Sequence, residues 1–179
     1  KKEYNLDIEW KPFEIHPETP KKGALTEDLP FPKGYLEMAF ANVKRLADQD
    51  GLMLKFSKKL PNSRLALYIS EFARKKGKFE EFHKLVLDAY WLEGKDIGDK
   101  SLLLNLAESV GLNKKEIEIY LDTDEPFKIV QNSLKEIRRY GINGVPAFLI
   151  ENRLIFGAQS YEVFKKVINN ILDEKSKEN

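Results

Sequence analysis

The stretch Ile142-Asn143-Gly144-Val145-Pro146-Ala147-Phe148-Leu149-Ile150 places a glycine and a proline directly before an apolar run. Proline cannot donate a ladder hydrogen bond, so in sheets it is confined to edges, bulges and strand starts. The run therefore predicts a strand over 147–151 that Pro146 opens. A second short strand is expected over 154–156. Glu151-Asn152-Arg153 predicts the tight turn between them, because Asn tolerates positive φ.

Helical periodicity fills most of the chain ahead of this hairpin. Apolar residues recur at three- and four-residue spacings, and Asn, Asp, Ser and Gly stand where helices begin and end. Asp124 followed by Glu125-Pro126 is a typical helix start, because proline fits the first turn. The predicted helices cover 35–50, 62–77, 79–94, 99–111 (starting at Asp99 or Ser101), 113–121, 124–140 and 160–171, and 174–179 is expected to be a solvated tail that frays.

The N-terminal region has a different pattern. Leu6 to Phe13 alternates apolar and polar residues, which predicts a half-buried strand that ends near Pro12. His16 to Pro32 is rich in proline and predicts a long irregular connection. The order of elements is therefore strand, helical block, hairpin and helix, which indicates an α/β fold with an embedded helical subdomain.

Composition limits the classes of function. The 179 residues are 42% hydrophobic and 33% charged, which is ordinary for a globular protein with one sizeable core. The formal net charge of +1 argues against a nucleic-acid partner bound through bulk positive charge. A local basic patch is still compatible with this net charge. No apolar run approaches the roughly 20 residues of a membrane span, so no membrane partner is expected. The first residues lack the apolar centre of a signal peptide, and a cytoplasmic location is expected.

The chain contains no cysteine, which excludes disulfides and thiolate metal sites within these residues. The two histidines, His16 and His83, are far apart in sequence, and two distant histidines are weak evidence for a metal site. Carboxylate pairs at Asp48/Asp50 and Asp122/Asp124 stand at expected helix ends, where capping explains Asp124 better than catalysis does. The basic run Lys55–Lys59 is expected to be a solvated connection. No catalytic, metal or cofactor-binding residue is therefore assigned, and no cofactor is expected.

Four segments resemble the DsbA-type thioredoxin-like family, and within it the cytoplasmic FrnE-like branch. They lie in the order found in that family and together span about Leu6 to Ile171. The segments are Trp10-Lys11-Pro12-Phe13-Glu14-Ile15-His16-Pro17, Asn62-Ser63-Arg64-Leu65-Ala66, Ala89-Tyr90-Trp91-Leu92-Glu93-Gly94-Lys95-Asp96-Ile97-Gly98, and Gly144-Val145-Pro146-Ala147-Phe148 followed by Phe156-Gly157-Ala158-Gln159.

The resemblance implies a thioredoxin-like fold with an inserted α-helical subdomain. The thioredoxin-like part is expected at 1–34 and 123–173, the helical subdomain at 35–122, and a tail at 174–179. Members of the family begin with a strand and a helix that carries Cys-x-x-Cys, and both are expected upstream of Lys1. In the family the helical subdomain roofs the active site, so some of the aromatics Phe72, Phe79, Phe82, Tyr90 and Trp91 could line a groove, although their helical spacing is typical of a core.

The implied function is that of a thiol-disulfide oxidoreductase acting on a thiol or disulfide in a protein or peptide. This chain would supply the cis-proline substrate-binding loop, with Gly144, Val145 and Pro146 as its substrate-binding residues, but not the catalytic cysteines. From the residues alone, a trans proline that opens an edge strand is the competing interpretation. With the other segments present, the cis form is favoured, which leaves the Val145 backbone free to pair with an extended peptide.

Two alternative functions remain open. Hydroxychromene-carboxylate isomerases and kappa-class glutathione transferases are similar in architecture, and they bind glutathione partly through the same loop. The segments at 10–17 and 89–98 look closer to the FrnE-like branch. The second alternative is a non-catalytic, thiol-free peptide-binding protein, which the absence of cysteine favours. A sheet that lacks its first strand argues against it, because an open edge invites aggregation.

Overall fold

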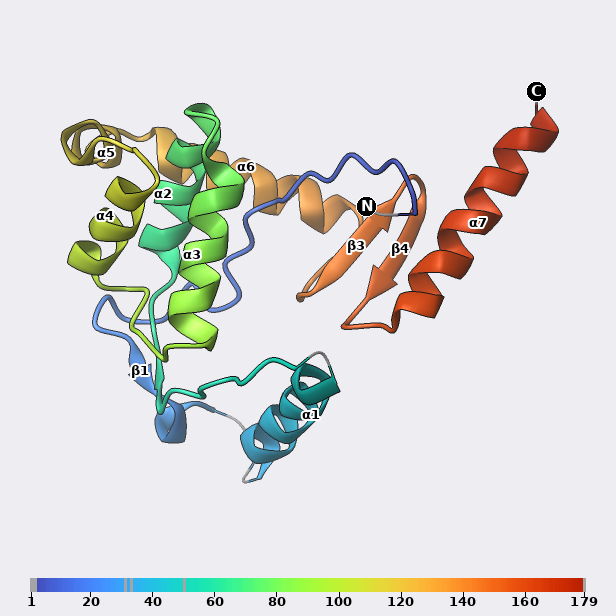
Figure 1. Ribbon diagram of the computed structural model, residues 1–179. Coiled ribbons are helices and arrows are strands. Elements are labelled where there is room, and N and C mark those ends of the chain that lie inside the picture. The colour runs from blue at the N-terminus through green and yellow to red at the C-terminus, as the bar shows by residue number, and fades with distance from the viewer. Residues whose placement is uncertain (1–2, 31, 33, 50, 179) are drawn as a thin grey trace. The chain divides into compact units, whose positions relative to one another are not determined.

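The structure is a computed structural model that describes residues 3–30, 32, 34–49 and 51–178. By its internal contacts the chain divides into two compact units, Lys1–Ser133 and Leu134–Asn179. The elements are, in order, β1 (Ala24–Leu25), a 3-10 turn η1 (Thr26–Asp28), α1 (Tyr35–Gln49), β2 (Lys59–Leu60), α2 (Arg64–Lys75), α3 (Phe79–Trp91), α4 (Lys100–Ser109), α5 (Lys114–Leu121), α6 (Glu125–Arg139), β3 (Ala147–Ile150), β4 (Arg153–Phe156) and α7 (Tyr161–Glu178) (Figure 1).

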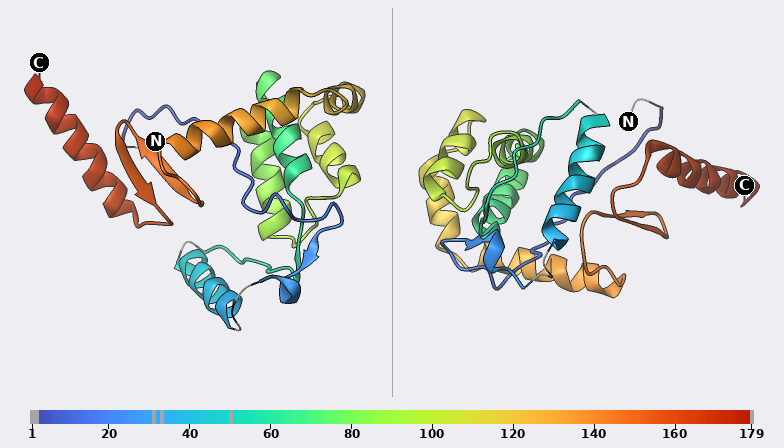
Figure 2. Two further views of the ribbon diagram at one scale, coloured as in Figure 1. Left: turned by 180° about the vertical axis from the view of Figure 1, so that it is seen from behind. Right: turned by 90° about the horizontal axis from the view of Figure 1, so that it is seen from below.

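Helices α2, α3, α4 and α5 form the core of the first unit and lie together in every view (Figures 1 and 2). Each contributes the side chains that its 3.6-residue periodicity places on one face. Several of these are completely excluded from solvent, including Ile69, Phe82, Leu103 and Ile117. Phe72 and Phe79 are buried as well, which confirms that these aromatics belong to the core of the helical block.

The helix ends follow the expected chemistry. Asp99 begins α4, because its carboxylate accepts from the backbone N–H groups of Ser101 and Leu102. Asn113 caps α5 in the same way. At α2 the cap is Asn62 rather than Ser63: its Oδ1 accepts from the Arg64 N–H at 3.1 Å, whereas Ser63 makes no side-chain cap. These bonds satisfy amides that have no partner inside their own helix.

The strand predicted over Leu6–Phe13 does not form. Residues 5–14 carry no regular secondary structure, and Ile8 and Trp10 are more than two-fifths exposed. A strand exists only with a hydrogen-bonded partner, and no strand in the described ranges pairs with this segment. Its carbonyls accept from side chains instead, Trp10 O from Arg74 at 2.8 Å and Pro12 O from Ser133 at 3.1 Å.

The segment that follows is held against α2 by a buried polar cluster. The Glu14 carboxylate is 4% exposed and pairs with Arg64 Nε at 2.9 Å, while Arg64 also donates to Pro17 O at 2.8 Å. Asn62 Nδ2 donates to the Thr19 carbonyl oxygen at 2.6 Å. The sequence did not predict the short antiparallel pair of β1 and β2, in which Ala24 pairs with Leu60.

The second unit contains the hairpin and α7. Strands β3 and β4 pair antiparallel, with Ala147 opposite Phe156 and Ile150 opposite Arg153. Phe148 contacts Phe164 of α7 edge to face, with ring centroids 4.8 Å apart. The predicted strands are therefore confirmed to within a residue. The domain boundaries expected from the family resemblance stay a prediction.

Two details at this end differ from expectation. In the turn, Glu151 rather than Asn152 adopts positive φ, at 53°. The predicted tail at 174–179 is helical as far as Glu178, because α7 continues through it. Glu174 pairs with Arg153, and Lys175 pairs with Glu151 at 2.7 Å. Ion pairs therefore connect the residues on either side of Asn152 in the hairpin to the C-terminal part of α7.

Candidate functional site

The loop that leads into β3 is anchored at both of its ends. Ile142 is 8% exposed, and its N–H donates to Ile137 O at 3.4 Å. At the other end Pro146 O accepts from the Gly157 N–H at 2.8 Å, which ties the loop to the residue after β4. The Val145–Pro146 peptide bond is cis, as the resemblance predicts. The three predicted substrate-binding residues, Gly144, Val145 and Pro146, therefore lie together between two fixed points.

Val145 presents its backbone to solvent. Neither its N–H nor its C=O makes a hydrogen bond to any residue that the structure describes, and the residue is 48% exposed. A Cβ built at Gly144 would meet no atom within 4 Å, so the space in front of the loop is open. Strand β3 pairs only with β4 in the described part of the chain, which leaves its other edge unpaired. A free strand edge can take up an extended peptide.

The chemistry of this loop is that of recognition. Residues 142–147 carry no charged or nucleophilic side chain, and the charges of the hairpin lie at its opposite end, in the Glu151 and Arg153 ion pairs. The arrangement can therefore bind a peptide through backbone hydrogen bonds and apolar contacts. It supplies no group that could attack a sulfur, carbonyl or phosphoryl centre.

The two histidines do not form a shared site. His16 Nδ1 lies 3.0 Å from a Glu18 carboxylate oxygen on the surface. His83 lies between the rings of Trp10 and Phe79, at centroid distances of 4.8 and 5.0 Å. Across the described ranges, no three His, Asp or Glu side chains gather as a metal ion would require.

His83 makes the stability of the first unit sensitive to pH. Its Nε2 is buried and has no hydrogen-bond partner among the described residues. Burial lowers the pKa of His83 below its ordinary 6.5; Glu80 raises that pKa slightly, and Arg74 lowers it further. Since the unfolded chain then binds the proton more readily than the folded chain, His83 does not reduce the free energy of unfolding above about pH 6.5. That free energy declines as the pH falls below this value and through the lower pKa of the folded state.

We therefore expect the melting temperature to fall between about pH 7.5 and about pH 5.5 by more in the wild type than in His83→Phe. The variant keeps a ring between Trp10 and Phe79 but cannot titrate. Thermal unfolding followed by circular dichroism at both pH values measures the difference. Equal losses in the two proteins would contradict the prediction.

The carboxylates considered from the sequence are ordinary helix-end groups. Asp48 accepts from Lys44 at 2.6 and 2.8 Å, and Asp50 lies outside the described residues. Asp122 is the C-cap residue of α5, and Asp124 pairs with Lys128 at 3.5 Å. Asp48 and Asp124 each pair with a lysine four residues along the chain, as helix-end carboxylates commonly do.

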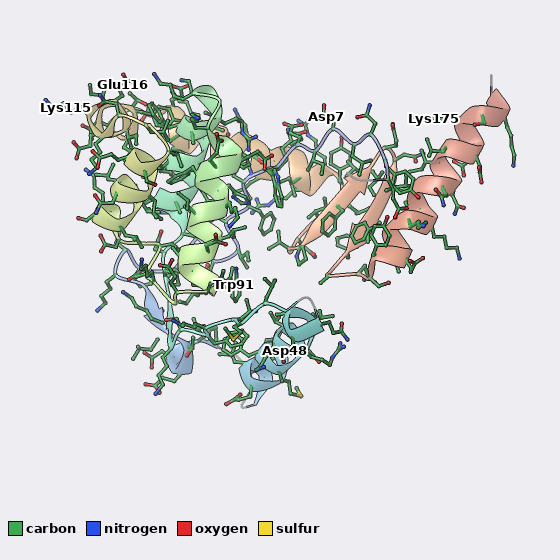
Figure 3. The ribbon with its side chains drawn as sticks, viewed as in Figure 1. Asp7, Asp48, Trp91, Lys115, Glu116 and Lys175 are labelled. Carbon is green, nitrogen blue, oxygen red and sulfur yellow. The ribbon has the colours of Figure 1, made fainter. Side chains whose placement is uncertain are left out.

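Two of the five aromatics that the sequence left between core and groove line a cavity of the first unit. Tyr90 and Trp91, at the end of α3, line a cavity together with residues of α1 and of the connection that follows it. Figure 3 labels Trp91 at the end of α3 that is nearer to α1. The helical spacing of Tyr90 and Trp91 did not distinguish a cavity wall from a core.

Within the described ranges, no helix is long and apolar enough to cross a membrane.

Comparison with known proteins agrees with the predicted fold. The family profile described as a DSBA-like thioredoxin domain matches residues 1–169. Among curated proteins, the chain is 29% identical over 177 residues to the uncharacterized protein YwbO of Bacillus subtilis (strain 168), covering 97% of this chain and 84% of that protein.

Two solved structures share the fold at low sequence identity. A probable DsbA oxidoreductase from Streptomyces coelicolor superposes with a TM-score of 0.79 at 20% identity, covering 90% of this chain and 74% of that one. A 2-hydroxychromene-2-carboxylate isomerase superposes with a TM-score of 0.70 at 17% identity, covering 80% of this chain and 70% of that one. The predicted thioredoxin-like fold is thereby confirmed.

Proposed function

Since the chain belongs to the DSBA-like thioredoxin domain family, we propose that it is the substrate-binding part of a thiol-disulfide oxidoreductase. In this role the loop at Gly144, Val145 and Pro146 aligns an extended protein or peptide substrate beside the reactive sulfurs. The observation that carries the proposal is the Val145 backbone, whose N–H and C=O have no partner among the described residues. Strand addition at such an edge recognises the peptide backbone and accepts many sequences.

The reaction needs a thiolate, and none of the 179 residues is a cysteine. Exchange begins when a thiolate attacks a disulfide sulfur, forming a mixed disulfide and releasing the other sulfur as a thiolate. A second cysteine then resolves the mixed disulfide. The proposed function therefore requires a cysteine pair outside these residues, as the FrnE-like branch carries in its Cys-x-x-Cys. A cytoplasmic setting stays part of the proposal.

The decisive experiment is peptide mass spectrometry of the protein isolated from its own cells, with and without thiol alkylation. We expect an upstream segment with an alkylatable Cys-x-x-Cys, and a disulfide reductase activity that alkylation abolishes. An upstream segment without cysteine, or an activity that survives alkylation, would overturn the proposal. Tight glutathione binding by calorimetry without disulfide exchange would favour the glutathione-dependent isomerase or transferase class instead.

Peptide binding by the chain itself can be measured separately. An extended, valine- and threonine-rich heptapeptide should shift the Val145 amide resonance and slow its hydrogen exchange, because a new backbone hydrogen bond forms there. The same peptide N-methylated at alternate residues lacks the donors and should bind about tenfold more weakly or not at all. Val145→Ala keeps the backbone and should bind within about twofold of wild type. Equal binding of both peptides would rule out strand addition.

A further inference from the structure

A cavity of ≈160 Å³ is lined by α1, the connection 51–58, the end of α3, β2 and three residues of the segment 16–29. All of the lining residues that the structure describes belong to the first unit, and none of them belongs to the loop at Val145. A dry cavity of about 150 Å³ is large enough to bind benzene. The size therefore suits a ligand with a single six-membered ring.

The walls suit a flat ring. Phe40 and Phe56 stack with centroids 4.7 Å apart and planes 25° from parallel. Phe56 meets the Trp91 indole edge to face at 6.2 Å, and Trp91 meets Tyr90 at 4.7 Å. Aromatic rings prefer these offset and edge-to-face arrangements, so a further ring can join the cluster at low cost. Side chains of four aromatic residues thus line one small space.

The backbone holds this wall in place. The Lys55 N–H donates to Trp91 O at 2.7 Å, which fixes the connection against the end of α3 directly beside Phe56. Lys95 N–H donates to Ala89 O at 2.8 Å and closes the α3 end. The hydrogen bond between Lys55 and Trp91 therefore joins two lining residues of the cavity through their backbones.

The polar groups of the cavity favour an anion. Lys55 is an exposed lining residue, and its ammonium makes no ion pair with any described residue. No Asp or Glu is among the lining residues that the structure describes; Glu18, which contacts the lining residue His16, is not one of them. Burial raises the pKa of the Tyr90 phenol above its ordinary value of 10.0, so its hydroxyl stays protonated and can donate a hydrogen bond.

We propose that this cavity binds a small aromatic carboxylate, with its ring among Phe40, Phe56 and Trp91 and its carboxylate at the Lys55 ammonium. The site is distinct from the loop at Val145, and the proposal does not depend on the oxidoreductase function. Its ligand class is one benzene ring that carries one acidic group, because the cavity holds one ring and Lys55 is the exposed lysine among its described lining residues.

The test uses 4-fluorobenzoate as the probe and fluorine NMR of the full 179-residue chain as the readout. We expect saturable binding with a dissociation constant of about 1 mM or tighter. The neutral isostere 4-fluorobenzamide should bind about fivefold more weakly, because it lacks the charge. Cyclohexanecarboxylate, which keeps the charge but not the flat ring, should compete poorly. In amide spectra the largest shifts should fall at Lys55, Phe56 and the Trp91 indole.

Two matched lysine variants test whether the Lys55 ammonium binds the carboxylate of the probe. Lys55→Met should weaken 4-fluorobenzoate binding about fivefold, whereas Lys58→Met, an equal charge change three residues away outside the cavity lining, should change it less than about twofold. Both side chains are exposed, so both variants should fold as the wild type does by circular dichroism. Absence of saturation at about 10 mM probe, equal effects of the two variants, or equal binding of the benzamide would each overturn the proposal.

Discussion

Phe82→Ala should lower the free energy of unfolding of the first unit by about 4 kcal/mol. Phe82 has no exposed surface and lies in the cluster that α2, α3, α4 and α5 share. The substitution removes a ring from the centre of this cluster and leaves a cavity that the close-packed neighbours cannot fill. For a chain of this size the melting temperature should fall by about 10 °C.

Phe127→Ala is the matched control for this change. Phe127 lies in the first turn of α6 and is 54% exposed, so the same atoms are removed without leaving a buried space. Its expected cost is below about 1 kcal/mol. Urea unfolding followed by circular dichroism compares the two variants. Similar losses for Phe82→Ala and Phe127→Ala would show that Phe82 is not in the core.

Arg64→Met is expected to cost about 3 kcal/mol, because it leaves the Glu14 carboxylate buried without a cation. The Glu14 side chain is 4% exposed, and its ion pair with Arg64 joins residues that lie 50 positions apart. The expected cost is at the low end of the range for buried pairs, since the Arg64 side chain is itself 40% exposed. The loss also releases Pro17 O, so the segment before β1 should become more accessible to proteases.

The double variant Glu14→Leu/Arg64→Met tests this cause. Without the carboxylate no buried charge remains, so the double variant should regain most of the stability lost in Arg64→Met. Lys44→Met breaks an exposed pair with Asp48 and should cost less than about 0.5 kcal/mol. If the double variant is as unstable as Arg64→Met, the loss arises from packing of the arginine stem and not from the unpaired charge.

Elements that depend on local sequence were predicted well. The helices from Tyr35 to Arg139 begin and end within a few residues of their predicted bounds, because caps such as Asp99 and apolar spacing act within one helix. The hairpin was predicted for the same reason: its two strands are neighbours in sequence, and the register that pairs Ala147 with Phe156 follows from the short turn.

Elements that depend on distant partners were predicted poorly. The alternation at Leu6–Phe13 predicted a strand, yet alternation describes two faces and cannot supply the neighbouring strand that pairing needs. Instead, side chains from α2 and α6 donate hydrogen bonds to the carbonyl oxygens of this segment. In the same way α7 continues through the predicted tail, where Glu174 and Lys175 pair with Arg153 and Glu151 of the hairpin.

By itself the sequence determined the helices, the hairpin, the loop at Gly144, Val145 and Pro146, and the absence of any thiol, since each is written in residue types or in spacings of a few residues. Only the tertiary structure decided that Glu14 would be buried against Arg64, that His83 would lie between two rings, and that Phe40, Phe56 and Trp91 would line one cavity. Each of these arrangements joins segments that are far apart along the chain. Their free energy comes from burial and desolvation, which arise only when distant segments meet.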